Sequence, residues 1–264
     1  MGVLPLQSRD SEGRLYIVGT GPGNLLQMTP RAFAALDEAD CVIGNGFYLD
    51  LVRPMLAGKE VIRSSMGREV DRAEKALALA RDRVVAMVSG GDAGVYGMAS
   101  IVLEVAERSA TAVPIEVIPG ITAAVSAAAR LGSPLSGDYV TMSLSDLLTP
   151  WEEIERRLDL AFRMRVPVVL YNPRSRGRPH NLDTAIEIAS RHLPGETPVG
   201  VVKNAYREGE ERLITTLGEF NDHITFVDMH SIVFVGGGET RIWRNETDAR
   251  GIITPRGYHR KYVY

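Results

Sequence analysis

The chain of 264 residues contains a single cysteine, Cys41. One thiol cannot form an intrachain disulfide, and it cannot supply the four cysteines of a structural zinc or iron–sulfur site. Three histidines, His192, His223 and His230, have no partner spacing that is typical of metal ligands. We therefore expect no metal site, and the cysteine usage fits the reducing cytoplasm.

Positive charge and aromatic side chains are also scarce. The formal net charge is -3 and only 6% of the residues are aromatic, so the sequence shows neither the basic footprint of a nucleic-acid-binding protein nor a stacking surface for single strands. No apolar run approaches the ~20 residues that cross a bilayer. The first ten residues lack the basic start and apolar core of a signal peptide. We expect a soluble protein with no nucleic-acid partner and no membrane segment.

The first half of the chain alternates short β-rich runs with helical patterns, which is typical of a parallel α/β sheet. Thr29 and Pro30 indicate the start of a helix, because a capping hydroxyl precedes a proline at the first helical position. Between residues 68 and 82, Val70 and several alanines recur at helical spacing with charges between them, which predicts a surface helix with a solvated charged face. Strands are expected near 15–19, 40–43, 60–63, 83–88 and 114–118.

Turn residues interrupt the pattern at 131–138, and the second half differs from the first. Its strands are separated by only two clear helices, which favours a mixed sheet. We therefore predict two α/β domains, residues 1–134 with a parallel sheet and residues 135–264 with a mixed sheet, and an active site in the cleft between them. The expected elements are strands near 138–143, 167–171, 198–202, 211–216 and 231–235 and helices near 150–164 and 180–192.

The first strand leads into an unusual glycine turn, Gly19-Thr20-Gly21-Pro22-Gly23-Asn24. A dinucleotide-binding turn has the spacing G-x-G-x-x-G and an acidic residue about 20 positions later for the ribose. Here the third glycine comes one residue early, and the next strand ends in Gly44-Asn45-Gly46 without a carboxylate. A nicotinamide-dependent oxidoreductase is therefore disfavoured.

Two further glycine turns follow expected strands, Ser89–Gly97 and Ile118–Ala124. The carboxyl ends of parallel strands are where open α/β sheets bind ligands, and glycines allow the backbone to approach a ligand closely. Any one of these turns could be an ordinary connection between a strand and a helix. Three of them at strand ends predict a shared pocket.

These turns resemble those of the tetrapyrrole (corrin and porphyrin) methyltransferases, on the segments Val18–Gly23, Gly90–Asp92 with Tyr96-Gly97, and Pro119–Ala123. The resemblance extends over nearly the whole chain. Ser143–Trp151, Leu170–Pro173 and Ile253–Tyr258 are most similar to the branch that methylates precorrin-3B at carbon 17 in cobalamin biosynthesis. The resemblance implies an S-adenosylmethionine-dependent enzyme, usually a homodimer. It implies methylation of precorrin-3B, or of the cobalt-bound cobalt-factor III (cobalt-precorrin-3), with ring contraction to precorrin-4 or cobalt-precorrin-4.

The resemblance also implies roles for individual residues. Gly21 and Gly23 are expected to face the tetrapyrrole, and Pro22 to contribute backbone to the cofactor site. The family usually has an acidic residue where this chain has Asn24, which leaves a backbone role to that turn. The remaining cofactor-binding residues that it implies are Gly90, Gly91, Asp92, Val95, Tyr96, Thr122, Ala123, Tyr171, Asn172, Asn204 and Ala205.

A basic loop follows the strand that ends at Tyr171. It contains Arg174, Arg176 and Arg178. A precorrin carries many acetate and propionate groups, and arginine pairs bidentately with carboxylates. We hypothesise that the three arginines bind the substrate; the alternative is a solvated basic loop.

Methyl transfer from a sulfonium needs positioning and no protein nucleophile. The ring contraction that the resemblance implies adds deprotonation of a hydroxyl, so a general acid or base would help. The candidates are Asp92, Asp146, His180 and Lys203. For His180 the alternative is a surface role in the loop, and for Asp146 it is capping of a helix.

Other functions share some of these features. Methyltransferases for other corrin positions, a diphthamide-pathway enzyme and a ribosomal-RNA ribose methylase belong to the same family. The last would profit from a basic face, which this acidic chain does not indicate. A non-catalytic small-molecule-binding module would bind the cofactor without turnover.

Overall fold

The computed structural model describes residues 13–246 and 248–263. The chain divides into two compact units, Met1–Thr122 and Ala123–Tyr264. The sequence placed the joint after residue 134, but helix α5 (Ala123–Leu131) groups with the second unit. The reason is packing, because α5 contacts strands β9, β10, β11 and β13 of that unit.

The first unit contains a five-stranded sheet in the order β3-β2-β4-β1-β5. Every neighbouring pair is parallel, which confirms the predicted parallel α/β sheet. Its central strands are buried on both faces, as the continuous apolar runs indicated. The strands are β1 (Arg14–Gly19), β2 (Cys41–Asn45), β3 (Glu60–Ser64), β4 (Val84–Ser89) and β5 (Ile115–Ile118).

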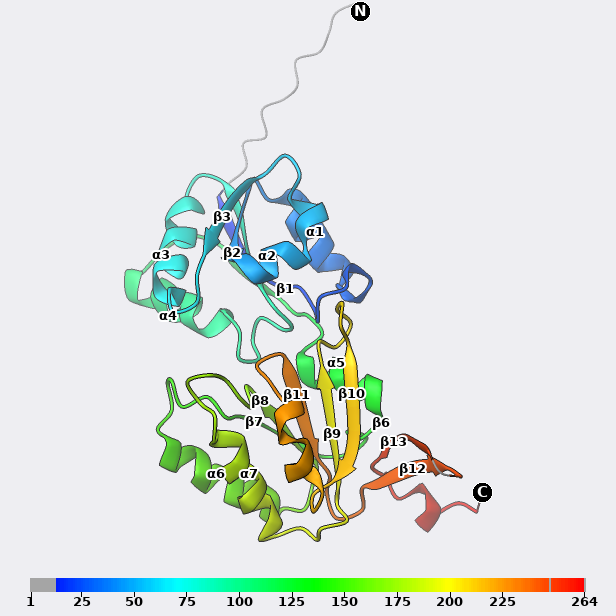
Figure 1. Cartoon of the computed structure of the whole chain (residues 1–264). Coiled ribbons are helices and arrows are strands. Elements are labelled where there is room, and N and C mark those ends of the chain that lie inside the picture. The colour runs from blue at the N-terminus through cyan, green and yellow to red at the C-terminus, as the bar shows by residue number, and fades with distance from the viewer. Residues whose placement is uncertain (1–12, 247, 264) are drawn as a thin grey trace, which may run out of the picture. The chain divides into compact units, whose positions relative to one another are not determined.

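Helices cover both faces of this sheet (Figure 1). Side chains alternate along β1, so Tyr16 and Val18 pack in the core beneath α1 and α2, while Leu15 and Ile17 pack beneath α3 and α4. The predicted cap of α1 is confirmed, because Thr29 Oγ1 accepts a hydrogen bond from the Ala32 amide at 3.2 Å. The helical segments are η1 (Leu25–Gln27), α1 (Pro30–Glu38), α2 (Gly46–Leu51), η2 (Arg53–Leu56), α3 (Glu69–Leu79) and α4 (Ala99–Ser109).

The connections change direction between β1 and β4. The chain leaves β1 and β2 through α1 and α2 toward the β3 edge of the sheet, and it leaves β3 and β4 through α3 and α4 toward the β5 edge. The strands β1 and β4 are neighbours, so their outgoing loops diverge. Such a switch point leaves a crevice outside the carboxyl ends of the two strands, and this is where open α/β sheets bind ligands.

The second unit contains a mixed sheet, as predicted. The order of its strands is β10-β9-β11-β8-β7. Only β7 and β8 pair in parallel; the other pairs are antiparallel. A second, three-stranded sheet was missed, because β6 has two residues and β12 is mostly exposed, so neither carries a buried pattern. The strands are β6 (Gly132–Ser133), β7 (Val140–Ser143), β8 (Val168–Tyr171), β9 (Pro198–Lys203), β10 (Glu211–Thr216), β11 (Ser231–Val235), β12 (Arg241–Asn245) and β13 (Asp248–Ile253).

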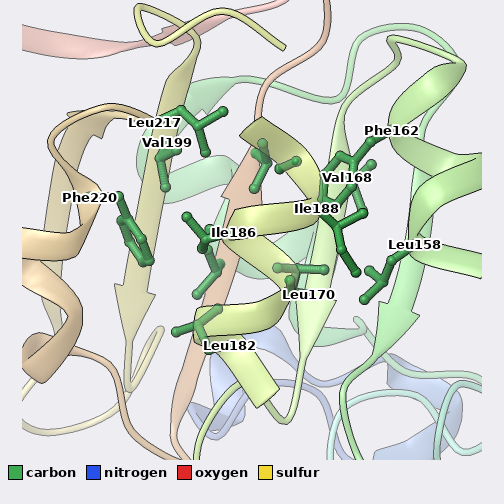
Figure 2. Packing of buried hydrophobic residues seen from close by; sticks show 14 of the residues in the cluster. Leu158, Phe162, Val168, Leu170, Leu182, Ile186, Ile188, Val199, Leu217 and Phe220 are labelled. Carbon is green, nitrogen blue, oxygen red and sulfur yellow. The ribbon is translucent and has the colours of Figure 1, made fainter. Parts of the chain in front are cut away.

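The core of this unit lies between its sheet and the helices α6 (Trp151–Arg163) and α7 (Asn181–Ser190). Figure 2 shows α6 and α7 side chains meeting apolar side chains of β8 and β9. Helix α5 packs on the opposite side of β9, where Gly200 leaves room for Leu131: a Cβ at Gly200 would lie 2.6 Å from Leu131 Cδ1. Short helical segments η3 (Phe220–Phe226) and η4 (Tyr258–Arg260) complete the unit. None of the described helices is long and apolar enough to cross a membrane.

Phe162 tests this core. It is fully buried on α6, so Phe162→Ala should lower the free energy of unfolding by roughly 3–5 kcal/mol through lost burial and the cavity left behind. Leu160, two positions earlier on the same helix, is 48% exposed, and Leu160→Ala should change it by less than about 1 kcal/mol. Urea denaturation of both variants measures the difference. Equal losses would contradict the core assignment.

Candidate functional site

The glycine turns after β1 and β4 are joined through their backbones. Gly21 donates to the Gly91 carbonyl at 3.0 Å, and Gly91 donates back to the Gly21 carbonyl at 2.8 Å. Just before this pair, the Thr20 amide and hydroxyl both donate to the Ser89 carbonyl, at 2.9 and 3.1 Å. The two loops at the switch point are therefore held in one fixed arrangement.

Asp92 connects this arrangement to the turn after β5. Its Oδ2 accepts from the Gly120 amide at 2.9 Å, and its Oδ1 accepts from the Gly94 amide at 2.8 Å. Carboxylates that accept backbone N–H groups in this way fix loops strongly. Both oxygens of Asp92 thus position the glycine turns, and its participation in cofactor binding or proton transfer stays a prediction.

Glycine is required at these turns by close backbone contact. A Cβ at Gly120 would lie 2.2 Å from the Gly91 carbonyl oxygen, and one at Gly19 would lie 2.6 Å from the Gly120 nitrogen. Gly21 also adopts a left-handed φ of +71°. The turns after β1, β4 and β5 therefore pack backbone against backbone at the carboxyl ends of these strands, and no side chain fits between them. We call Gly19, Gly91 and Gly120 the glycine floor.

The other predicted residues of the first unit lie around this floor. Pro22 is buried, and Asn24 Oδ1 accepts from the Leu26 amide at 2.9 Å. Asn24 is therefore the cap of η1, which a carboxylate could equally provide. Val95 and Thr122 are half-buried, whereas Tyr96 is exposed and has a left-handed φ of 52°. A bulky residue in that conformation is a strained position of the kind that gathers at functional sites.

In the second unit, the predicted residues lie at one end of the strands of the mixed sheet. Strands β7 and β8 run parallel, so Ser143 and Tyr171 lie at the same end. Strand β11 is antiparallel to both β8 and β9, which places Lys203 beside Ser231 at that end. The loops that carry Asn172, Asn204 and Ala205 therefore leave the same edge.

Side chains fix these loops. The buried Tyr171 accepts from the Ala124 amide at 2.8 Å through its hydroxyl, so it caps the first turn of α5 beside Ala123. Asn172 has φ 51° and donates from Nδ2 to Ser143 Oγ at 3.0 Å. Asn204 has φ 50°, and its amide donates to the His230 carbonyl at 3.1 Å. Asparagine is among the residues that tolerate this left-handed conformation best.

The three loop arginines are not equivalent. Arg174 donates to the Ile224 carbonyl at 3.1 Å, and Arg176 is exposed in the tight turn that Ser175 and Arg178 close. Arg178 donates to Ser145 Oγ at 2.9 Å and makes a 3.5 Å contact with Met229 Sδ. Its buried Nε has no hydrogen-bond acceptor among the described residues. Both partners of this guanidinium are neutral, so neither compensates its charge.

Of the remaining acid–base candidates, Lys203 is paired and two are exposed. Lys203 Nζ lies 2.8 Å from Asp228 Oδ2, and this hydrogen bond raises the pKa of the lysine. Burial raises the pKa of Asp228, but the hydrogen bonds from Lys203 and the His230 amide outweigh it, so the pKa ends below its usual value. Lys203 is therefore held as the ammonium. Asp146 is exposed after β7, and the exposed His180 has its Nδ1 3.2 Å from Asp183 Oδ2.

Sequence reasoning missed Asp228 and Met229, which contact Lys203 and Arg178. They precede β11, and only the antiparallel pairing of that strand brings them to the edge where β8 and β9 end. No local pattern indicates this pairing. Among residues 13–246 and 248–263, no three His, Cys, Asp or Glu side chains gather as a metal site.

The architecture defines an α/β protein with packed glycine turns at the switch point of its first sheet and polar side chains at the ends of β7, β8 and β9 in its second. The family described as tetrapyrrole (corrin/porphyrin) methylases matches residues 14–221. The chain therefore belongs to the tetrapyrrole methylase family, which confirms the resemblance.

Three curated relatives are similar along nearly the whole chain. Cobalamin biosynthesis protein CbiHC of Archaeoglobus fulgidus is 44% identical over 96% of this chain, which spans only 54% of that longer protein. The probable cobalt-factor III C(17)-methyltransferase of Salmonella typhimurium is 43% identical, covering 92% of this chain and 99% of its own. Precorrin-3B C(17)-methyltransferase of a Sinorhizobium species is 40% identical, covering 93% and 97%.

Solved structures share the fold. The crystal structure of the methyltransferase CobJ matches with a TM-score of 0.84 at 32% identity, covering 92% of this chain and 100% of that one. Uroporphyrin-III C-methyltransferase from Thermus thermophilus, complexed with S-adenosylhomocysteine, matches with a TM-score of 0.66 at 24% identity, covering 85% and 97%. The second likeness shows the fold alone.

The glycine floor predicts a steric effect. Gly120→Ala brings a methyl group within 2.2 Å of the Gly91 carbonyl oxygen, so we expect a loss of about 1–3 kcal/mol or more in the free energy of unfolding. Gly137→Ala, at an exposed turn with nothing within 4 Å of the added carbon, should stay within about 0.5 kcal/mol of the wild type. Chemical denaturation compares the two, and equal stabilities would disprove the close contact.

The Lys203–Asp228 pair predicts a pH dependence. Because the pKa of folded Asp228 is lowered, its stabilising contribution is complete above the unfolded value of about 3.9 and is lost as the pH falls through the lower folded value. Asp228→Asn should therefore be less stable than the wild type at pH 7, and the difference should shrink below about pH 4. Thermal unfolding across this range measures it; a difference that is constant with pH would rule the pair out as its cause.

Proposed function

We propose that this chain transfers a methyl group from S-adenosylmethionine to carbon 17 of precorrin-3B or of its cobalt-bound counterpart, cobalt-factor III. The proposed product is the ring-contracted precorrin-4 or cobalt-precorrin-4. Family membership and the names of two relatives that match over nearly their whole length support this reaction. The structural observation that carries the proposal is the glycine floor at the switch point between β1 and β4.

The glycine floor fits S-adenosylmethionine. Backbone packs directly on backbone at Gly19, Gly91 and Gly120, and we propose that this compact arrangement lets the cofactor lie close to the strand ends. When bound, S-adenosylmethionine supplies an electrophilic methyl group on its sulfonium. The residues proposed to hold it are Pro22, Gly90, Gly91, Asp92, Val95, Tyr96, Thr122, Ala123, Tyr171, Asn172, Asn204 and Ala205.

The contribution of the chain itself is mainly positioning. An in-line transfer gains from fixed geometry, and well-oriented groups reach effective molarities of about 10⁵ M or more. Asp92 serves this role by holding the turns after β4 and β5 through the Gly94 and Gly120 amides. No side chain has to act as a nucleophile.

Arg178 supports an anionic substrate. Its guanidinium is oriented by Ser145 Oγ at 2.9 Å, yet its buried Nε has no acceptor among the described residues. An oriented but uncompensated guanidinium favours binding of a carboxylate, and a precorrin carries many of them. Arg174, Arg176, Gly21 and Gly23 remain proposed secondary contacts.

Proton transfer during ring contraction is assigned to the polar residues near these loops. Asp146 and His180 are exposed and can exchange protons with solvent or substrate. Lys203 is held as an ammonium by Asp228, which favours an acid over a base. We further propose a cytoplasmic homodimer, which light scattering and cell fractionation would test.

Mass spectrometry of paired reactions tests the function. The protein is incubated with S-adenosylmethionine and either metal-free precorrin-3B or cobalt-factor III. Gain of one methyl group together with a ring-contracted product on either substrate is the expected result and identifies the route. Methylation of a different corrin intermediate alone would favour another position specificity. Cofactor binding without turnover on any intermediate would favour a binding module.

Substitution of Arg178 tests the substrate contact. Arg178→Met should raise the KM for the tetrapyrrole by about tenfold or more, because a charge-assisted hydrogen bond is lost, while affinity for S-adenosylhomocysteine should not change. Arg163→Met is the matched control, since Arg163 is exposed at the end of α6, which leads to the opposite end of β8. Unchanged KM in a folded Arg178→Met variant would refute the contact.

A further inference from the structure

Helix α3 buries a charge where the sequence predicted a solvated face. Arg72 is 4% exposed and lies on the buried face with Ala73, Ala76 and Leu77. Val70, which the spacing assigned to that face, is instead 48% exposed. Arg72 thus occupies a buried position in the first turn of α3 where an apolar side chain is expected. Burial of its charge needs a physical explanation.

Arg72 is poorly compensated for its burial. Its Nη2 lies 3.3 Å from Glu69 Oε1, and that same oxygen accepts the Gly67 amide at 3.0 Å. The buried Nε has no acceptor among the described residues. Burial also lowers the pKa of Arg72, as expected for a desolvated cation. A buried guanidinium with one long, shared hydrogen bond is costly, and such a group commonly serves binding.

Arg72 lies at the carboxyl end of the parallel sheet, the end at which the glycine turns lie. The chain reaches α3 from the carboxyl end of β3, so the first turn of α3 lies at the edge where the glycine turns lie. Tyr48 lies at this end of the sheet as well, because α2 begins directly after the carboxyl end of β2. The ring of Tyr48 covers Gly90, where a Cβ would lie 2.1 Å from Tyr48 Cε1. Arg72 therefore lies at the same end of the sheet as the turn that follows β4.

The guanidinium of Arg72 is suited to binding a carboxylate. The fork of a guanidinium matches the two oxygens of a carboxylate, and Glu69 already shows that one reaches Nη2. The Arg72 side chain is only 3% exposed, but Glu69 is 41% exposed and can move into solvent, so displacement of Glu69 would open the guanidinium to a ligand. We propose that Arg72 binds a carboxylate of the ligand at the carboxyl edge of the first sheet, in exchange for Glu69.

This inference rests on the proposed function, which offers two carboxylate sources. One is the methionine carboxylate of S-adenosylmethionine, and the other is an acetate or propionate of the tetrapyrrole. Binding of S-adenosylhomocysteine and of 5′-methylthioadenosine, which lacks the amino-acid carboxylate, separates them. Calorimetry on the full chain measures both affinities, and steady-state kinetics gives the KM for the tetrapyrrole.

The test compares Arg72→Met with Arg68→Met. The control removes an arginine next to the same helix end, where Arg68 is exposed and paired with Asp71 at 2.8 Å. If the cofactor supplies the carboxylate, Arg72→Met should weaken S-adenosylhomocysteine by about tenfold or more and leave methylthioadenosine unchanged. If the substrate supplies it, the KM for the tetrapyrrole should rise by a similar factor. Arg68→Met should alter neither.

Two results overturn the inference. One is a folded Arg72→Met variant with unchanged affinities and KM; the other is an equal loss for S-adenosylhomocysteine and methylthioadenosine, which indicates support of the turn. If Arg72→Met does not fold, Glu69→Gln decides: removal of the competing carboxylate should tighten carboxylate binding several-fold, and no gain overturns the inference. Failure of the proposed function is distinct, because the wild type itself would then neither bind S-adenosylhomocysteine nor transfer a methyl group.

Discussion

The arrangement of the first unit depends on direct backbone contact between three turns. Gly21 and Gly91 exchange hydrogen bonds, and Asp92 carries the connection to Gly120. The contact is possible only without side chains, since a Cβ at Gly120 would meet the Gly91 carbonyl oxygen at 2.2 Å. Because β1 and β4 send their chains in opposite directions, this rigid floor lies where the crevice of an open sheet forms. If a ligand binds here, turns that are already fixed reduce the conformational-entropy cost of binding.

In the second unit, the loops at the strand ends are also fixed, but by side chains. Its loops are fixed by side chains that bond to neighbouring backbone or hydroxyl groups: Tyr171 to the start of α5, and Asn172 to Ser143. Left-handed φ values at Asn172 and Asn204 turn the chain sharply after β8 and β9. Glycine would permit the same turns, but it would lose these bonds and add unfolded-state entropy. Backbone contacts therefore fix the turns of the first unit, whereas polar side chains fix the loops of the second.

The sequence predicted the parts of the fold that local patterns determine. Burial on both faces fixed the strands of the parallel sheet, and the hydroxyl of Thr29 fixed the start of α1. What it missed depends on tertiary pairing. The two-residue β6 exists only because β13 pairs with it, and Met229 reaches Arg178 only because β11 runs antiparallel to β8. Periodicity likewise cannot distinguish Val70 from Arg72 at the edge of a helix face, since the neighbouring elements decide which is covered.

Charge compensation separates ordinary arginines from those with a candidate role. Arg31, for example, forms exposed pairs with Glu38 and Glu116, and pairs of this kind contribute little to stability. Arg72 and Arg178 differ because each has a buried Nε without an acceptor among the described residues. Under the proposed function, a chain with a net charge of -3 cannot attract the polyanionic substrate by its overall field. We therefore propose that Arg72 and Arg178 provide local positive charge for carboxylates, because a charge interacts more strongly with a carboxylate where water is excluded.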